Sequence, residues 1–496
     1  MKTAKEYFKF DNTYIKLPSK FYQRIKPEPV KNPTLIKLNL QLSNYLNLEI
    51  SSLKNNSGIS ILSGNQVPKN TTPIAMVYAG HQFGNFVNQL GDGRAVLIGE
   101  IIAKDGKRYD LQLKGSGKTM YSRQGDGRAP LGPVIREYII SEAMYHLGIP
   151  TTRALSIIST GEFVEREKIE PGGVLARISS SHIRIGTFEF FSARKDFNAL
   201  KKIADYTIRR HYPEILSKNK NNYSLLLEKV ILSQAKLISQ WMNFGFIHGV
   251  MNTDNTSISG ETIDYGPCAF INNYDPMTVY SYIDFQGRYS FGNQPKIMLW
   301  NLSKFAESIS SLIDEDPNLA NQKIINSLKK FPELFSKFWI KGIKKKIGLS
   351  STFQNDTKLI ESLLDMMYKE EADFTLTFRK LAESLKNEQK KNDFFSLFNN
   401  KEHFLDWYQK WNLRIKKEKE SKDILLKKMN AVNPLFIPRN HLVEKAINET
   451  VEKNNLSMLD DLLEVLKNPF TEKKNKSKFS RPPDNSEDIK NTFCGT

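Results

Sequence analysis

Residues able to bind a metal ion or accept a proton gather in two short segments near the middle of this 496-residue chain. The first, 248–255, reads His-Gly-Val-Met-Asn-Thr-Asp-Asn, and the second, 264–266, reads Asp-Tyr-Gly. Asn255 and Asp264 offer oxygen atoms of the kind that Mg²⁺ accepts as ligands. Asp254 is the only carboxylate in the first segment. This combination predicts phosphate chemistry that depends on a divalent cation.

The two segments follow the pattern of a protein-kinase catalytic loop, His-Arg-Asp-x-x-x-x-Asn, and of the Asp-Phe-Gly that comes after it. His248 takes the place of the motif histidine, and Asn255 and Asp264 take the places of the two magnesium ligands. Val250, however, stands where a kinase has the aspartate that accepts the proton of the substrate hydroxyl. Because a valine cannot accept a proton, the chain is either an inactive kinase-like protein or an enzyme that transfers another group.

Asp254 is the candidate for the missing base, since its carboxylate could take the proton of an incoming hydroxyl. Two other roles stay open for it, a further metal contact and a turn-forming residue. The histidines show no metal-binding spacing, so the sequence does not indicate zinc.

Two glycine-containing segments could approach phosphates closely. Gly91 and Gly93 precede an apolar strand, as the glycines of a kinase phosphate-binding loop do, although a plain hairpin turn explains them equally well. Asp126 and Gly127 belong to a second Gly-Asp-Gly-Arg, at 125–128, and two such loops could cover both ends of a triphosphate. The segment 115–119, Gly-Ser-Gly-Lys-Thr, lacks the first glycine of a P-loop, which disfavours that interpretation.

A lysine at the end of a strand and a glutamate in the next helix form a further kinase-like pair. Lys114 ends the strand, and Glu137 lies in the helix, with Glu142 as its rival on another face. Separately, each could be an ordinary surface residue. Arg177 and Arg184 are candidate phosphate clamps, because a guanidinium binds oxyanions with two hydrogen bonds; surface positions are the alternative.

The order of the elements predicts an α+β protein with strands first and helices later. Residues 95–102 and 109–114 flank a turn and predict a hairpin, and 133–148 has the apolar spacing and the terminal Gly of a helix. Helical spacing dominates after residue 188. We expect an N-terminal arm (1–40), a β-rich lobe (41–187), a helical lobe with a C-terminal extension (188–466) and a basic flexible tail (467–496).

Composition limits the remaining possibilities. Hydrophobic residues make up 40% of the chain, which supports a substantial core. No apolar run approaches the roughly 20 residues of a membrane span, and the N-terminus has no apolar signal segment. The net charge of +18 could indicate nucleic-acid binding, but basic and acidic residues alternate along most of the chain, which favours a solvated surface. With two cysteines there is no disulfide framework, and we expect a cytoplasmic protein.

Taken together, these segments resemble the selenoprotein O family, whose members have a kinase-like, two-lobed fold and act as protein adenylyltransferases. The resemblance also rests on 78–84 (Tyr-Ala-Gly-His-Gln-Phe-Gly), 121–123 (Tyr-Ser-Arg) and 433–440 (Asn-Pro-Leu-Phe-Ile-Pro-Arg-Asn). It covers roughly 35–447, most of the chain.

The resemblance implies a role for each candidate. The family binds ATP in the reverse orientation to kinases, transfers AMP to protein Ser, Thr or Tyr hydroxyls, and in some members uses UTP. Asp254 would be the proton acceptor, Glu137 would pair with Lys114, and Asn255 and Asp264 would ligate Mg²⁺ or Mn²⁺. The residues implied to hold the nucleotide are Gly91, Gly93, Arg94, Lys114, Asp126, Gly127, Arg177, Arg184 and Asp264.

The tail departs from the family pattern. Family members often end in a selenocysteine or a closely spaced cysteine pair, whereas this tail has Cys494 alone. A disulfide within the tail is therefore impossible, and a bond between Cys268 and Cys494 is the remaining redox hypothesis.

Overall fold

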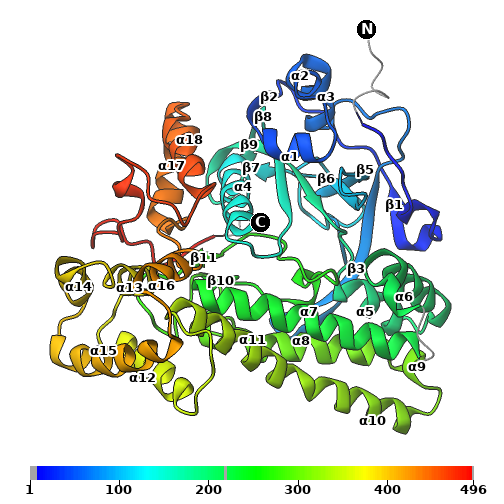
Figure 1. Ribbon diagram of the computed structural model, residues 1–496. Helices are drawn as coiled ribbons and strands as arrows, with labels where there is room; N and C mark the ends of the chain where they lie inside the picture. Colours follow the sequence, from blue (N-terminus) through cyan, green and yellow to red (C-terminus); the bar gives the residue numbers. More distant parts are fainter. Residues whose placement is uncertain (1–7, 217–220, 494–496) are drawn as a thin grey trace.

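The protein combines one large antiparallel sheet with many helices. The computed structural model describes residues 8–216 and 221–493, and in them strands dominate the first part of the chain and helices the second (Figure 1). The α+β class expected from the order of elements is confirmed. None of the helices in these described ranges is both long and apolar enough to cross a membrane.

The sheet has the strand order β1-β3-β5-β6-β9-β8-β2, with β4 paired to β3 and β7 paired to β9. Every pairing in it is antiparallel. The strand bounds are β1 Tyr22–Arg24, β2 Thr34–Leu38, β3 Ile74–Gln82, β4 Asn85–Gly91, β5 Ala95–Ile102, β6 Arg108–Lys114, β7 Ala129–Pro130, β8 Arg153–Glu165 and β9 Ile169–Ser179.

Both faces of the sheet are covered by helices. Alternate residues of the central strands point to opposite sides, so each strand contributes to the core on both faces. Val96 and Leu113 pack on one face under three short helices, while Leu97 and Leu175 pack on the other face with α4. The bounds of these helices are α1 Leu40–Tyr45, α2 Ile50–Lys54, α3 Asn56–Ser63 and α4 Leu131–His146.

The predicted hairpin and the predicted helix are both present. In the β5–β6 hairpin Ala95 lies opposite Lys114, so the lysine sits at the open end of the ladder. Helix α4 begins two residues before the predicted start at 133, because Ala129 and Pro130 first pair with β9 as β7. It ends at His146, and Gly148 follows with a left-handed backbone (φ +79°).

Helices make up most of the chain after β9. Their bounds are α5 Ile185–Ala193, α6 Phe197–His211, α7 Asn222–Phe244, α8 Gln294–Ser308, α9 Ser310–Ile313, α10 Pro317–Leu328, α11 Lys330–Lys346, α12 Asp356–Lys369, α13 Phe374–Glu383, α14 Glu388–Phe395, α15 Lys401–Ile415, α16 Lys422–Asn430, α17 Asn440–Lys453 and α18 Ser457–Leu466. In Figure 1, α7, α8, α10 and α11 lie below the sheet, and α17 and α18 lie beside α4.

A small ladder between helices α7 and α8 presents the loop that carries Asp254. Helix α7 stops at Gly245, and the next two residues form β10 (Phe246–Ile247), which pairs with β11 (Ala269–Phe270). The chain between them, 248–268, is therefore held at both ends. It contains all the residues of the two chemical segments described above.

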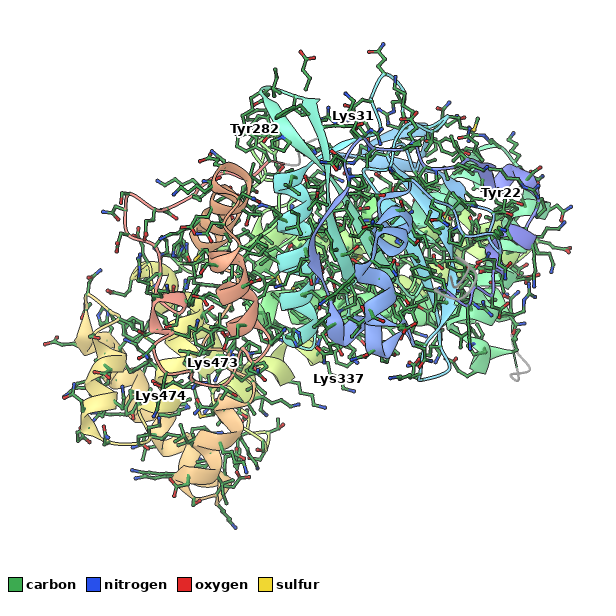
Figure 2. All side chains as sticks on the ribbon, turned by 90° about the horizontal axis from the view of Figure 1, so that it is seen from above. Tyr22, Lys31, Tyr282, Lys337, Lys473 and Lys474 are labelled. Atoms are coloured by element: carbon green, nitrogen blue, oxygen red, sulfur yellow. The ribbon has the colours of Figure 1, made fainter. Side chains whose placement is uncertain are left out.

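The segment after α18 runs back toward this loop. Thr492 N donates to Tyr280 O (2.7 Å), and Asn440 Nδ2 donates to Ile489 O (3.2 Å). Lysines are spread over the surface, with Lys31 and Lys474 at well separated places in Figure 2. Cys268 is buried, and Cys494, its hypothetical partner, lies outside the described residues.

Candidate active site

A cavity of about 720 Å³ opens between the sheet and the 248–268 loop. This is a suitable size for a nucleotide. The structure brings together every residue that the sequence assigned to nucleotide, metal or proton transfer, and Glu137 lies just behind them. The cavity residues in question are Gly91, Gly93, Arg94, Lys114, Asp126, Gly127, Arg177, Arg184, Asp254, Asn255 and Asp264.

Asp264 lies at the centre of a cluster of cations. Its Oδ1 is 3.0 Å from Lys114 Nζ and 2.6 Å from Arg177 Nη1, and its Oδ2 contacts Arg184. Burial by itself raises the pKa of Asp264, but the attraction of these cations outweighs burial and holds the pKa well below its usual value. These contacts therefore favour the ionised form of Asp264.

The strand lysine and the helix glutamate form the expected ion pair. Lys114 Nζ lies 2.6 Å from Glu137 Oε2, and Arg177 reaches the other oxygen of the same carboxylate at 3.2 Å. The rival Glu142 instead binds Arg153 with two hydrogen bonds, of 2.7 and 2.6 Å, on another face of α4. Glu137 thus fixes two cations that point into the cavity.

The two arginines are not surface residues. The side chains of Arg177 and Arg184 are only 2% and 3% exposed, so the surface alternative is wrong for both. Asp92, between Gly91 and Gly93, points inward: it accepts hydrogen bonds from Met76 N and Gln112 Nε2 (both 3.0 Å). Its Oδ1 lies 3.8 Å from Arg184 Nη2, so its negative charge partly neutralises that arginine.

Asp254 has very different surroundings from Asp264. Its Oδ1 is buried and has no hydrogen-bond partner, and its Oδ2 accepts only a long bond (3.3 Å) from Gln82. Arg184 binds the backbone oxygen of Asp254 (2.7 Å) and not its carboxylate. Burial raises the pKa of Asp254 to about 6, although Arg184 opposes the shift. This carboxylate can therefore change its protonation near neutral pH, as a general base must.

The end of the β3–β4 hairpin holds Asp254 in place. His81 N donates to Thr253 Oγ1 (2.7 Å), and Phe83 N donates to Asn252 Oδ1 (3.1 Å). Gly80 lies so close that a Cβ there would stand 2.5 Å from Asp254 Oδ1. The conformation of Asp254 thus depends on a strand that is distant in sequence.

His248 fastens the first chemical segment to the second. Its Nε2 lies 2.8 Å from Ile263 O, next to Asp264, and its ring stacks on Trp241. Asn255 Nδ2 donates to Val250 O (3.1 Å), which leaves the Asn255 carbonyl oxygen available to a metal ion. His248 is fully buried and has a structural role here.

The two Gly-Asp-Gly-Arg segments line one wall of the cavity. Gly91 has φ +151° and packs against the ring of Tyr121, where a Cβ would clash at 2.4 Å. Asp126 binds Arg166 with two hydrogen bonds of 2.9 Å. Arg166, from the β8–β9 turn, also lines the cavity, and the sequence analysis missed it.

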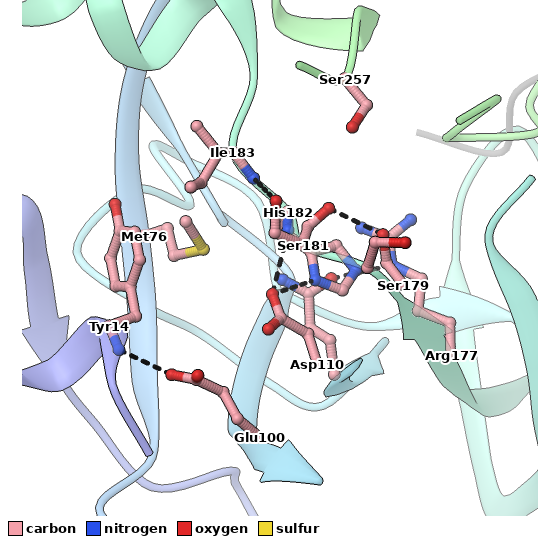
Figure 3. Close-up of polar contacts among 12 residues, drawn as sticks. Tyr14, Met76, Glu100, Asp110, Arg177, Ser179, Ser181, His182, Ile183 and Ser257 are labelled. Atoms are coloured by element: carbon pink, nitrogen blue, oxygen red, sulfur yellow. Dashed lines mark hydrogen bonds and ion pairs between the residues drawn. The ribbon is translucent and has the colours of Figure 1, made fainter. Parts of the chain in front are cut away.

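A second polar cluster lies behind Arg177 and joins the sheet to α6. Asp110 accepts hydrogen bonds from the backbone and the ring of His182 (2.9 and 3.0 Å), as Figure 3 shows. Arg210 on α6 binds both Asp110 (2.6 Å) and Glu100 (2.7 Å). Burial lowers the pKa of His182 to about 4, so this histidine is neutral at physiological pH. The cluster stiffens the strands that carry Lys114 and Arg177.

The donor set fits a hard divalent cation. Among the described residues no group of three or more His, Cys, Asp or Glu side chains could hold a metal ion by itself. Mg²⁺ typically binds to one or two protein oxygens and completes its shell with phosphate oxygens and water. One carboxylate from Asp264 and one amide oxygen from Asn255 match that requirement when a nucleotide is present.

Comparisons with known proteins identify the class of enzyme to which the chain belongs. The family model described as "Protein adenylyltransferase SelO" matches residues 5–467. The chain therefore belongs to this family, as its sequence motifs predicted.

Three relatives illustrate the similarity, and each is named protein nucleotidyltransferase YdiU. The relative from Rhizobium meliloti (strain 1021) is 49% identical over 489 residues, which cover 99% of each chain. The one from Bradyrhizobium diazoefficiens is 50% identical over 490 residues, again 99% of each chain. The one from Bacillus cereus (strain G9842) is 50% identical over 487 residues, 98% of each chain.

Proposed function

We propose that this enzyme transfers AMP from ATP to Ser, Thr or Tyr hydroxyls of other proteins and releases pyrophosphate. Family membership supports nucleotide transfer to proteins. The observation that carries the assignment of the base is the buried, unpaired Oδ1 of Asp254 at the cavity wall. UTP is a further candidate donor, because the family resemblance implies that some members use it.

The arrangement of the elements suits a two-lobed, kinase-like fold. Strands β3–β9 with α2–α4 would form the body of the N-lobe (41–187), helices α6–α18 would form the larger lobe (188–466), and the nucleotide would lie between them. Strands β1 and β2, the first and last in the strand order of the sheet, belong to residues 1–40. Residues 1–40 would form an arm and 467–496 a basic tail. Asp264 of the larger lobe would bridge the two lobes in this proposal, through its contacts with Lys114, Arg177 and Arg184 of the N-lobe.

Positive charge concentrated around Asp264 would hold the triphosphate. Lys114, Arg177 and Arg184 converge there, and oxyanions of phosphate can replace part of their contact with the carboxylate. Arg94 and the backbone at Gly91, Gly93 and Gly127 would bind the remaining phosphate oxygens. Asp126 would act through Arg166, which it orients with two hydrogen bonds.

Asn255 and Asp264 would hold Mg²⁺ or Mn²⁺. When bound, the ion would neutralise phosphate charge and orient the triphosphate. The low pKa of Asp264 keeps this ligand ionised without competition from protons.

Asp254 would accept the proton of the acceptor hydroxyl. As the O–H bond breaks, the oxygen forms a bond to the α-phosphorus, and the bond from that phosphorus to the bridging oxygen of pyrophosphate breaks. The proton then resides on Asp254 and returns to solvent. Val250 leaves the usual kinase position without a base, which fits a reacting phosphorus displaced from the γ position.

Radiolabelled ATP distinguishes this function from its alternatives. With ATP labelled at the α-phosphate, we expect label on acceptor proteins from a cell lysate, and with γ-label we expect none. Label from the γ-position alone would indicate a protein kinase with a relocated base. Tight ATP binding with neither label transferred would indicate a pseudokinase scaffold.

A further inference from the structure

A second hollow, which the nucleotide site does not use, lies between helices α8, α10 and α11. Its volume is about 580 Å³, and its floor is formed by Ile297, Leu299, Trp300, Ile325 and Leu328. Ile325 is 46% exposed, although it is a large apolar residue on an amphipathic helix. A concave apolar surface of this kind is typical of a site that binds another molecule.

The charges around the hollow all have one sign. Arg288, Lys296 and Lys329 line it, and no lining residue carries a carboxylate. None of these three cations forms an ion pair with any residue in the described ranges. Some other lysines of these helices are paired, as Lys304 is with Glu307 (2.9 Å) and Lys330 with Glu228 (2.7 Å). The rim therefore offers unneutralised positive charge beside an apolar floor.

The hollow also touches the hairpin end that positions the proposed base. Trp300 packs edge-on against His81 (5.2 Å between ring centroids). The Arg288 guanidinium lies beside Gly84, where an added Cβ would be 3.5 Å from Arg288 Cζ. Between these two contacts Gln82 donates to Asp254. A chain bound in the hollow would therefore leave it close to the mouth of the nucleotide cavity.

We propose that this hollow is a docking site for the acceptor protein, and that it binds a segment with an apolar side chain flanked by Asp or Glu. The inference rests on the proposed function for the meaning of "acceptor", but the binding itself does not need catalysis. The apolar side chain would fill the floor at Trp300 and Ile325, and the carboxylates would pair with Lys296, Lys329 and Arg288. Such a site selects substrates by sequence outside the modified hydroxyl and holds that hydroxyl near Asp254.

The direct test is binding of a short fluorescein-labelled peptide in which Leu-Phe is flanked on both sides by glutamates, followed by fluorescence anisotropy. We expect saturable binding that weakens as salt rises from about 0.05 to about 0.5 M. The double variant Lys296→Glu, Lys329→Glu should weaken binding about tenfold or more. Ile325→Asp should also weaken binding, because it places a charge in the apolar floor of the hollow. All three changed positions are exposed, and ATP binding, measured in parallel, reports that the variants are folded.

A matched control separates the effect of charge at the hollow from the effect of the net charge of the whole protein. Lys31→Glu with Lys474→Glu changes the net charge by the same amount at exposed positions outside the hollow, and it should change peptide affinity less than about twofold. Equal weakening by both double variants, or equal binding of a peptide with lysines in place of the glutamates, would overturn the proposal. Displacement of the acidic peptide by a single-stranded oligonucleotide at lower concentration would also overturn it, in favour of a nucleic-acid site.

Transfer kinetics distinguish this proposal from the proposed function. With the acidic peptide extended by a Ser-Thr-Tyr segment and α-labelled ATP, the Lys296→Glu, Lys329→Glu variant should raise KM about tenfold and leave kcat unchanged, because it removes only binding. Normal KM in that variant would contradict docking while leaving adenylyl transfer intact. Peptide binding through these lysines without label transfer would contradict the proposed function while leaving docking intact.

Discussion

The loops that carry Asp254 and Asp264 lie in one cavity but give their carboxylates opposite surroundings. Three cations surround Asp264 and hold its pKa far below the usual value, whereas Asp254 has no cation on its carboxylate and a pKa of about 6. A permanently ionised carboxylate suits a metal ligand, and one that titrates near neutrality suits a base. The contrast supports the two different roles proposed for two chemically identical side chains.

Removing the Asp264 carboxylate should have the largest effect. Asp264→Asn eliminates a proposed metal ligand and leaves Glu137 as the close anion of Lys114 and Arg177, and Asp92 as that of Arg184. We expect transfer to fall by about 10³-fold or more, together with weaker Mg²⁺-dependent ATP binding. Isothermal titration with Mg²⁺-ATP measures the second effect, and unchanged affinity would remove Asp264 from the metal site.

Neutralising Asp254 should stabilise the protein at high pH. The folded pKa of about 6 lies above the usual 3.8, so burial of the ionised form costs about 3 kcal/mol at neutral pH. The sign follows from that order: the penalty is absent below pH 3.8, grows between the two values and is complete above pH 6. Urea unfolding at pH 8 and pH 5 should therefore show a larger gain for Asp254→Asn at pH 8. An equal gain at both values would show that the pKa is not raised.

A single methyl group at Gly80 should displace the base without removing it. The Cβ of Gly80→Ala would meet Asp254 Oδ1 at 2.5 Å, so the carboxylate must move. We expect transfer about 10- to 100-fold slower with ATP affinity close to wild type. A wild-type transfer rate would mean that the position of Asp254 is not critical. Gly106, which has open space around it, provides the matched Gly→Ala control.

Gln82→Met should have the smallest effect. The substitution removes the hydrogen bond from Gln82 to the Asp254 carboxylate, which favours its ionised form, and keeps the volume of the side chain similar. The pKa of Asp254 should rise, so the acidic limb of the pH–rate profile should move to higher pH, and the rate should fall about twofold near pH 6 and less at pH 7. A fall in rate that is the same at every pH would point to a structural role instead.

The sequence was sufficient for the parts of the site that depend on local order. The β5–β6 hairpin places Lys114, α4 places Glu137, and the spacing from His248 to Asp264 follows a known loop pattern. Binary patterning of strands and helices also predicted the fold class. These features depend on residues close together in the chain, where periodicity and turn chemistry are informative.

The parts that could not be predicted depend on contacts between distant segments. Arg166 reaches Asp126 across forty positions, and the hairpin end at Gln82 meets Asp254 across 172. No local pattern marks either contact. The sequence also does not reveal that Asp92 points inward to Gln112 and Arg184. Helix α4 began earlier than predicted because β7 fixes the chain just before it.

The central claim is that Asp254 accepts the proton while Asp264 holds the metal-bound nucleotide. The most direct measurement compares, for Asp254→Asn and the wild-type enzyme, transfer of α-labelled phosphate to protein from pH 5 to pH 8 alongside ATP affinity. The account predicts a wild-type rate that rises through about pH 6, a variant rate lower by about 10²- to 10⁴-fold without that rise, and equal ATP affinity. A variant that transfers label at the wild-type rate with the same pH dependence would contradict it.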